Sequence, residues 1–451
     1  MQAIPRSMTV FVMCLLVYTL NLRGLPSGDT LPTALLPFTL LLDGTLALDR
    51  FAPLLNQLWD DQAYFLVAGE EHTWSSYPVA AGLLVAPLYL PLLLFDLGGL
   101  SVHELLDIAL QMEQVVAATI AAVAVVAVYH LLRRLVDEAD AIGLALLFAF
   151  GTSIWSTSSQ ALWQHGPAVL LLTLSMLQLC TRDLGLSRRA AERIGARPRD
   201  VHSARALALC GLFGALAVAA RPADLPWLPA VASWLVVQRT TLRGWLAWTL
   251  PVAAVAGLVV LYNLETSGAW LGSYYLSKGT GAEPAVALAG LLVSPGRGLF
   301  VYTPFLVLAV LGATSWIRRG GTWAPSIVFP SLGFVCGCLA LHASWFSWWG
   351  GWCFGPRVLI DLLPALFVLM LPVLPAVEGR WWSRGLLLLA CAVAVSVQAV
   401  GAFCYPRGAW DELPVNVDAA PERLWDWSDN PIRRAAMAGP DLSGWQAQTR
   451  E

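Results

Sequence analysis

The chain has 451 residues, of which 57% are hydrophobic and only 13% are charged. Soluble proteins carry about 25% charged residues, so this composition excludes an ordinary soluble domain and predicts an all-α polytopic membrane protein. The net charge of −3 says little by itself, because most charges stand in loops, and we expect no nucleic-acid partner.

The chain opens with Arg6 and an apolar run that no small-residue cleavage site follows, which is typical of a retained signal anchor. Because a helix needs about 20 apolar residues to cross a bilayer, we predict a bundle of eleven spans. The spans lie at residues 8–22, 113–132, 140–158, 165–181, 205–220, 223–238, 244–263, 299–316, 324–342, 358–376 and 385–403. The amphipathic pattern of residues 100–114 predicts a separate interfacial helix before the second span.

Basic residues are distributed unevenly between the loops that join these spans. One set of loops carries fifteen: Arg133, Arg134, Arg182, Arg188, Arg189, Arg193, Arg197, Arg199, Arg205, Arg239, Arg243, Arg318, Arg319, Arg380 and Arg384. The alternate loops carry six: Arg23, Arg50, Arg221, Lys278, Arg297 and Arg357. Because Lys and Arg are enriched in cytoplasmic loops, the first set predicts a cytoplasmic N-terminus in a multi-pass protein of the inner (plasma) membrane.

This orientation places the first loop, residues 23–112, and the tail, residues 404–451, on the external side of a membrane bundle formed by residues 1–403. It requires the apolar run 78–97, which two prolines interrupt, to enter the membrane without crossing it, as a re-entrant or interfacial helix. In the alternative, this run crosses the membrane, the N-terminus is external and the acidic first loop is cytoplasmic.

The first external loop holds the acids that could take part in chemistry. Asp29 lies just beyond the first helix, between a glycine and Thr30. It could cap a helix that starts near Leu31, or it could take a proton from an acceptor hydroxyl. The adjacent acids Asp60 and Asp61 are typical of a solvated loop, with metal ligation as the alternative.

Three external arginines each stand at a helix end beside a proline or a glycine. They are Arg221, Arg297 and Arg357. These side chains could lie at the membrane interface and pair with Asp224 or Asp361. Alternatively, they could bind a phosphate group through two parallel hydrogen bonds.

Other polar and aromatic side chains join the candidates on the external side. His165 begins a span, where it could be a hydrogen-bonded structural residue or a substrate ligand. Tyr77 and Lys278, the single lysine of the chain, are further candidates for binding substrate or phosphate. The tryptophan-rich run 344–352 is typical of an interfacial aromatic belt, and its rings could also stack on a sugar.

Several stretches along nearly the whole chain carry a family resemblance. They are Gly28–Pro32, Ser76–Val79, Gln160–Pro167, Ser294–Tyr302, Trp348–Leu359 and Arg423–Trp427. With the order of one helix, a long acidic loop and many further helices, they resemble the C-type glycosyltransferase superfamily (GT-C). These are membrane enzymes that use polyprenyl-phosphate sugars, and they include protein O-mannosyltransferases and lipid A aminoarabinose transferases.

The resemblance implies a GT-C-like bundle in which the acid of the first external loop, here Asp29, is the general base. It also implies juxtamembrane helices within that loop, at residues 31–42, 50–66 and 78–97. It implies no organic cofactor. The relatives differ in metal dependence, which therefore stays open.

One position departs from the family pattern. In such enzymes a basic residue precedes the Tyr-Pro or Pro-Pro of the third juxtamembrane helix and contacts the carrier phosphate. Ser76 occupies that position here. The phosphate contact would then either shift, to Arg297 or Arg357, or be weaker.

We therefore expect a hexosyl- or pentosyltransferase of the cell envelope. It would move a sugar, with inversion, from a polyprenyl-phosphate donor to a hydroxyl of a lipid, glycan or protein acceptor. Asp29 would take the proton, and arginines would stabilise the leaving phosphate. The alternatives are a transporter or flippase for a lipid-linked or small substrate, which the lack of an internal repeat disfavours, and a non-catalytic membrane scaffold.

Overall fold

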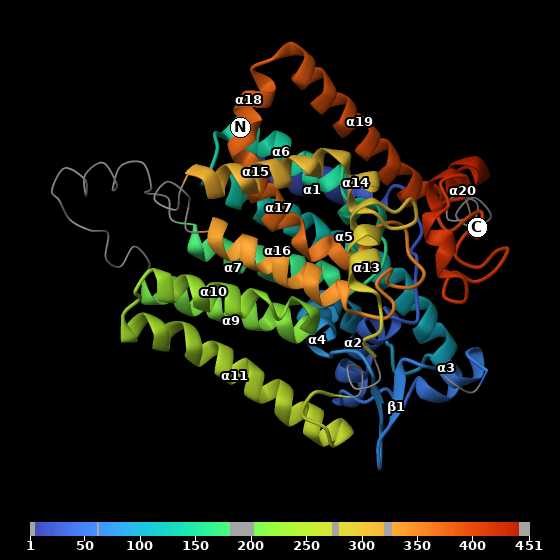
Figure 1. Cartoon of the computed structure of the whole chain (residues 1–451). Helices are drawn as coiled ribbons and strands as arrows, with labels where there is room; N and C mark the ends of the chain where they lie inside the picture. Colours follow the sequence, from blue (N-terminus) through green and yellow to red (C-terminus); the bar gives the residue numbers. More distant parts are fainter. Residues whose placement is uncertain (1–4, 61–62, 181–202, 273–278, 320–326, 442–451) are drawn as a thin grey trace.

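The computed structural model of the chain describes residues 5–60, 63–180, 203–272, 279–319 and 327–441. The regular structure over these residues is helical apart from one antiparallel hairpin of two short strands, β1 (Leu66–Ala68) and β2 (Thr73–Ser75). The hairpin and the C-terminal tail lie toward the same end of the bundle, on the right in Figure 1.

The N-terminal part consists of one bundle helix and most of the loop predicted to be external. We call residues 20–101, which contain that part of the loop, the external segment. Helix α1 (Arg6–Thr19) is followed by α2 (Leu31–Asp43), α3 (Ala52–Leu58), the hairpin, α4 (Ala80–Val85) and the 3-10 helix η1 (Ala86–Leu94). Apolar side chains of α2, α3 and the first turns of α5 (Val102–Leu132) form a separate core beside the main one.

The remaining helices build the main bundle. Its first half contains α5, α6 (Glu138–Phe150), the π-helical turn η2 (Ile154–Ser158), α7 (His165–Leu179), α9 (Ala204–Ala220), η3 (Pro222–Asp224), α10 (Trp227–Val237) and α11 (Leu242–Ser267). The second half contains α13 (Pro284–Val293), α14 (Leu299–Tyr302), η4 (Pro304–Leu306), α15 (Val307–Arg319), α16 (Val328–Ala343), η5 (Arg357–Leu362), α17 (Leu363–Met370), η6 (Leu371–Val373), α18 (Leu374–Glu378) and α19 (Trp381–Cys404). The tail adds η7 (Pro421–Trp425) and α20 (Pro431–Ala438). Helix α5 packs against α1 and α7, α7 against α9, and α9 against α11.

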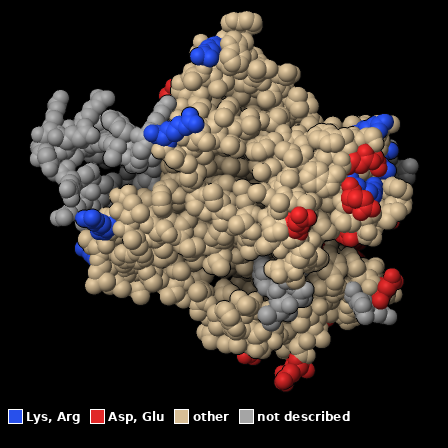
Figure 2. All heavy atoms as spheres, viewed as in Figure 1, with Lys and Arg blue, Asp and Glu red and all other residues tan. Residues whose placement is uncertain are grey.

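Four helical segments among the described residues are long and apolar enough to cross a membrane: α5, α11, the run from η5 to α18, and α19. They indicate a multi-pass membrane protein. In the most apolar part of α11 only 11% of the residues are buried, and in that of α19 only 22% are. Leucines such as Leu258 and Leu388 therefore face outward. Figure 2 shows a broad uncharged middle on this face, with charged side chains toward its margins. Lipid can solvate such a surface, whereas water would not.

The prediction of a separate interfacial helix over residues 100–114 is wrong. Helix α5 runs without interruption from Val102 to Leu132. A capping box begins it, in which the backbone N–H of Glu104 donates to the Ser101 hydroxyl and the backbone N–H of Ser101 donates to the Glu104 carboxylate. The apolar face of residues 100–114 packs against protein instead, because the first turns of α5 bury Leu105 in the core of the external segment.

The juxtamembrane helices that the family resemblance implies are found in part. Helix α2 matches residues 31–42 closely, but among the described residues of the stretch 50–66 only Ala52–Leu58 is helical. Residues 78–97 hold a helix in two parts, which changes from α to 3-10 geometry next to Pro87 because proline lacks an N–H for the α-helical bond. The predicted spans other than the four long apolar segments hold helices of 17 residues or fewer.

The contact between α15 and α17 makes a prediction about packing. A Cβ atom added to Gly312 would lie 2.0 Å from the carbonyl oxygen of Leu369. We expect Gly312→Leu to lower the midpoint of thermal unfolding in detergent by several degrees, because overpacking costs about 1–3 kcal/mol. The control is Gly257→Leu in α11, where no atom lies within 4 Å of the added Cβ. Equal midpoints for the two variants would contradict the close contact.

Candidate functional site

A cavity of about 1190 Å³ opens between the external segment, the bundle and the C-terminal tail. Its wall combines residues 23–29, the turn 160–165 before α7, the tryptophan-rich loop 345–358 and polar side chains of the tail such as Asp418. Segments from both ends of the chain therefore meet at one hollow.

Asp29 lines this cavity and has polar partners on both carboxylate oxygens. Its Oδ1 accepts a hydrogen bond from the Tyr64 hydroxyl at 2.9 Å and another from the Tyr77 hydroxyl. Its Oδ2 pairs with Nη1 of Arg357 at 2.8 Å. The capping role considered for Asp29 is not realised, because Thr30 occupies the N-cap of α2 and no side chain caps that helix. The carboxylate is thus held by donors from three other parts of the chain.

The hairpin explains why two tyrosines reach the same carboxylate oxygen. Leu66 pairs with Ser75 in the ladder, and a bond from Ser76 N to the Phe65 carbonyl, 2.8 Å long, continues the pairing by one step. Tyr64 and Tyr77 stand opposite each other one step further. Desolvation of its hydroxyl and the Asp29 carboxylate raise the pKa of Tyr64. The tyrosine therefore stays protonated and remains a hydrogen-bond donor.

Arg357 begins the 3-10 helix η5 and faces Asp29 from the bundle side. Its guanidinium lies over the Trp163 ring, 4.0 Å from the ring centroid, and donates to the Gly350 carbonyl as well as to Asp29. Gly350 has a φ of +74°, a conformation that suits glycine. Trp163, Gly350 and Asp29 thus fix the guanidinium from three sides.

A second charged group lines the cavity around Arg221. The guanidinium Nη1 pairs with Oδ2 of Asp361 at 2.7 Å and with Asp224 at 3.4 Å. Nδ1 of His165 also lies 2.9 Å from Oδ2 of Asp361. Because η5 carries both Arg357 and Asp361, this one short helix connects the Arg221 group to the Asp29 group. The pairing of Arg221 with the two aspartates, considered from the sequence, is therefore confirmed.

Arg297 is not among the described residues that line the cavity. Arg297 is 1% exposed, and its guanidinium pairs with Asp411 at 2.6 Å and donates to the carbonyls of Trp349 and Gly351. Arg297 thus joins the tail to the tryptophan-rich loop. Lys278 lies outside the described residues.

Sequence reasoning missed several residues of the site. Tyr64 was missed, because the strands that place it opposite Tyr77 are only three residues long. The tail was predicted only as an external segment, yet Asp418 accepts from the Trp349 indole at 2.6 Å and Asn416 from the Trp352 indole at 3.2 Å. No short motif in the tail marks these contacts.

No family model, curated protein or solved structure matches the chain. Within the described part of the chain, no group of three or more His, Cys, Asp or Glu residues is arranged to hold a metal ion. The chemistry of the site therefore has to be argued from its own geometry.

The contacts of Arg297 predict that it attaches the tail. We expect Arg297→Ala to accelerate limited proteolysis within residues 404–441, because breaking a buried ion pair costs about 3–5 kcal/mol. The matched control is Arg50→Ala, which removes a half-buried pair with Asp43 at the protein surface and should cost about 1 kcal/mol or less. Identical cleavage rates in both variants would show that the tail is held by other contacts.

Proposed function

We propose that this protein is a membrane glycosyltransferase of the GT-C type, with about eleven transmembrane helices and its site on the external face. It would transfer a sugar from a polyprenyl-phosphate donor to an acceptor hydroxyl, with inversion at the anomeric carbon. The observation that carries the proposal is the meeting of Asp29 and Arg357 in a cavity that Arg221 and His165 also line.

Asp29 has the properties of a positioned base. Its carboxylate is 22% exposed, so a hydroxyl in the cavity can reach it, and the two tyrosines fix its orientation. A general base has to lie within hydrogen-bond reach of the proton that it takes. An acceptor hydroxyl entering beside Tyr64 and Tyr77 satisfies that requirement.

Arg357 is well placed to bind a phosphate group beside that base. Its guanidinium is 11% exposed, is backed by the Trp163 ring and lines the cavity beside Asp29. Arg221 supplies a second cation on the cavity wall, although Asp361 and Asp224 neutralise it. Positive charge where the leaving group develops negative charge is the main electrostatic requirement of such a transfer.

Aromatic rings on the cavity wall suit a sugar. Trp345, Trp349 and Trp352 line it from the tryptophan-rich loop, and Trp59 lines it from the end of α3. The apolar face of a sugar ring stacks on such side chains while its hydroxyl groups reach polar partners. Asn416 and Asp418 offer those partners from the tail.

The proposed reaction is a single displacement. The acceptor oxygen forms a bond to the anomeric carbon as the bond between that carbon and the phosphate oxygen breaks. The proton of the acceptor hydroxyl goes to Asp29, and the bonding electron pair leaves with the lipid phosphate. Phosphate bound at Arg357 would compete with Asp29 for the guanidinium, which would increase the basicity of the carboxylate as the donor binds.

The central prediction concerns Asp29. Asp29→Asn should abolish transfer, because an amide cannot accept the proton, while the unfolding midpoint in detergent stays close to that of the wild type. The assay incubates purified protein with radiolabelled polyprenyl-phosphate sugars and an extract of candidate acceptors, and it follows loss of the lipid donor. Asp43→Asn, which changes a half-buried acid of the same external segment, should retain full turnover. Wild-type turnover by Asp29→Asn would remove Asp29 from the mechanism.

The role of Arg357 makes a separate prediction. Arg357→Gln should raise the KM for the lipid donor by about tenfold to a hundredfold, because a hydrogen bond to a charged group contributes about 1.5–3 kcal/mol. The KM for the acceptor should change less. Arg50→Gln tests whether loss of any external positive charge has the same effect. An unchanged donor KM in Arg357→Gln would place the phosphate elsewhere.

A further inference from the structure

A second cavity, of about 720 Å³, is a groove in the bundle on the other side of the turn η2, and it opens to the surface at Asp140, Gly143 and Leu388. Helices α6 and α19, the junctions η4–α15 and η6–α18, and one residue of α1 form its wall. Trp155 lines this cavity, whereas the next two residues, Ser156 and Thr157, line the candidate site. One short turn therefore separates the two cavities.

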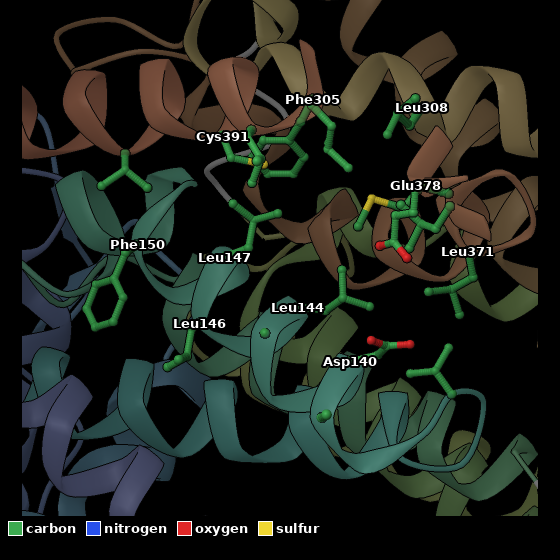
Figure 3. A pocket seen from close by; sticks show the side chains of 18 of the residues that line it. Asp140, Leu144, Leu146, Leu147, Phe150, Phe305, Leu308, Leu371, Glu378 and Cys391 are labelled. Carbon is green, nitrogen blue, oxygen red and sulfur yellow. The ribbon is translucent and has the colours of Figure 1, made fainter. Parts of the chain in front are cut away.

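The second cavity is apolar except at one end. Among the described residues that line it, Asp140 and Glu378 are the charged ones, and all the others are apolar or glycine. Figure 3 shows the two carboxylates facing each other from opposite walls, with Phe150 at the left of the view. Neither carboxylate has an ion-pair partner among the described residues.

The dimensions of the cavity suit one leaflet of a bilayer. Asp140 and Phe150 are ten residues apart on α6, which corresponds to about 15 Å along a helix that rises 1.5 Å per residue. Half of a hydrocarbon core about 30 Å thick is also about 15 Å. Asp140 lies at the end of α6 that follows Arg133 and Arg134, where the lipid headgroups of the arginine-rich side are expected.

We propose that this cavity binds a hydrocarbon chain of a membrane lipid whose headgroup carries a primary ammonium group, such as an ethanolamine phospholipid. The chain would lie along α6 and α19 toward Phe150 and Trp155. The ammonium group would lie between Asp140 and Glu378, where it forms charge-assisted hydrogen bonds. Two carboxylates that have no ion-pair partner among the described residues disfavour a headgroup that has only negative charge.

The test uses the full-length protein in nanodiscs of phosphatidylcholine. A trace of phospholipid with a photoreactive diazirine at the end of one chain is added, with either an ethanolamine headgroup or the same headgroup N-acetylated. After illumination, labelled peptides are identified by mass spectrometry. We expect the ethanolamine probe to label the peptides that contain Phe150, Trp155 and Phe305 about tenfold more than the acetylated probe does, the ratio that one charge-assisted hydrogen bond supplies.

Two kinds of variant test separately the binding of the hydrocarbon chain and the recognition of the headgroup. Gly143→Trp fills the cavity from α6 and should abolish labelling of these peptides, whereas Gly257→Trp in α11 should leave it unchanged. Neither glycine has an atom within 4 Å of an added Cβ. Leu388→Trp, at an exposed lining position, is the second filling variant if Gly143→Trp fails to fold. Asp140→Asn combined with Glu378→Gln should remove the preference for ethanolamine and keep the labelling.

Three results would overturn the proposal. Equal labelling by the two probes in the wild type would show that the ammonium group is not recognised. Labelling of Phe150 and Trp155 that survives in both folded filling variants would show that the chain lies elsewhere. A preference for ethanolamine that persists in the double variant would exclude the two carboxylates as its cause. None of these results depends on glycosyl transfer.

Discussion

The ion pair between Asp29 and Arg357 is the contact on which the candidate site depends. It joins residues 328 positions apart, and so it fixes the external segment to the helix η5 of the bundle. A partly buried ion pair such as this one is more stable when the other polar atoms around it also have partners. Tyr64 and Tyr77 meet that need for the carboxylate, and the Gly350 carbonyl does so for the guanidinium. A ligand that takes Arg357 away from Asp29 would therefore change the charge of the cavity and the hold on the external segment together.

The three arginines predicted to be external show what cannot be inferred from the sequence. Arg221, Arg297 and Arg357 share one local pattern, a helix end beside proline or glycine, yet the fold gives them three environments. Asp361 and Asp224 neutralise Arg221, Asp411 and backbone carbonyls enclose Arg297, and Arg357 alone of the three pairs with Asp29. A local sequence pattern indicates that a cation lies at a helix end. It does not indicate which distant acid the cation pairs with.

Apolar runs were enough to predict a helical chain with several long apolar helices, because burial or lipid contact requires such runs whatever the tertiary arrangement. Asp29 was also predictable, as an acid placed just beyond the first helix. Its partner Tyr64 was not, because strands of three residues show no alternation that fixes a register. The interfacial helix predicted over residues 100–114 failed for a related reason: its amphipathic face is covered by α2 and α3, and nothing in the pattern distinguishes protein from a membrane surface as the covering partner.

The turn η2 gives the two cavities a common wall. Its bond from Ser159 N to the Ile154 carbonyl, 2.9 Å long, spans five residues, and π-helical turns of this kind occur frequently at functional sites. Thr157 donates to the Phe354 carbonyl on the side of the candidate site, while Trp155 faces the apolar cavity. A hydrocarbon chain packed against Trp155 would restrict η2, the turn that also forms part of the wall of the candidate site. Occupancy of the apolar cavity and binding in the site are then linked if the turn has two arrangements that each ligand stabilises differently, which makes η2 the element through which lipid composition would act on the site.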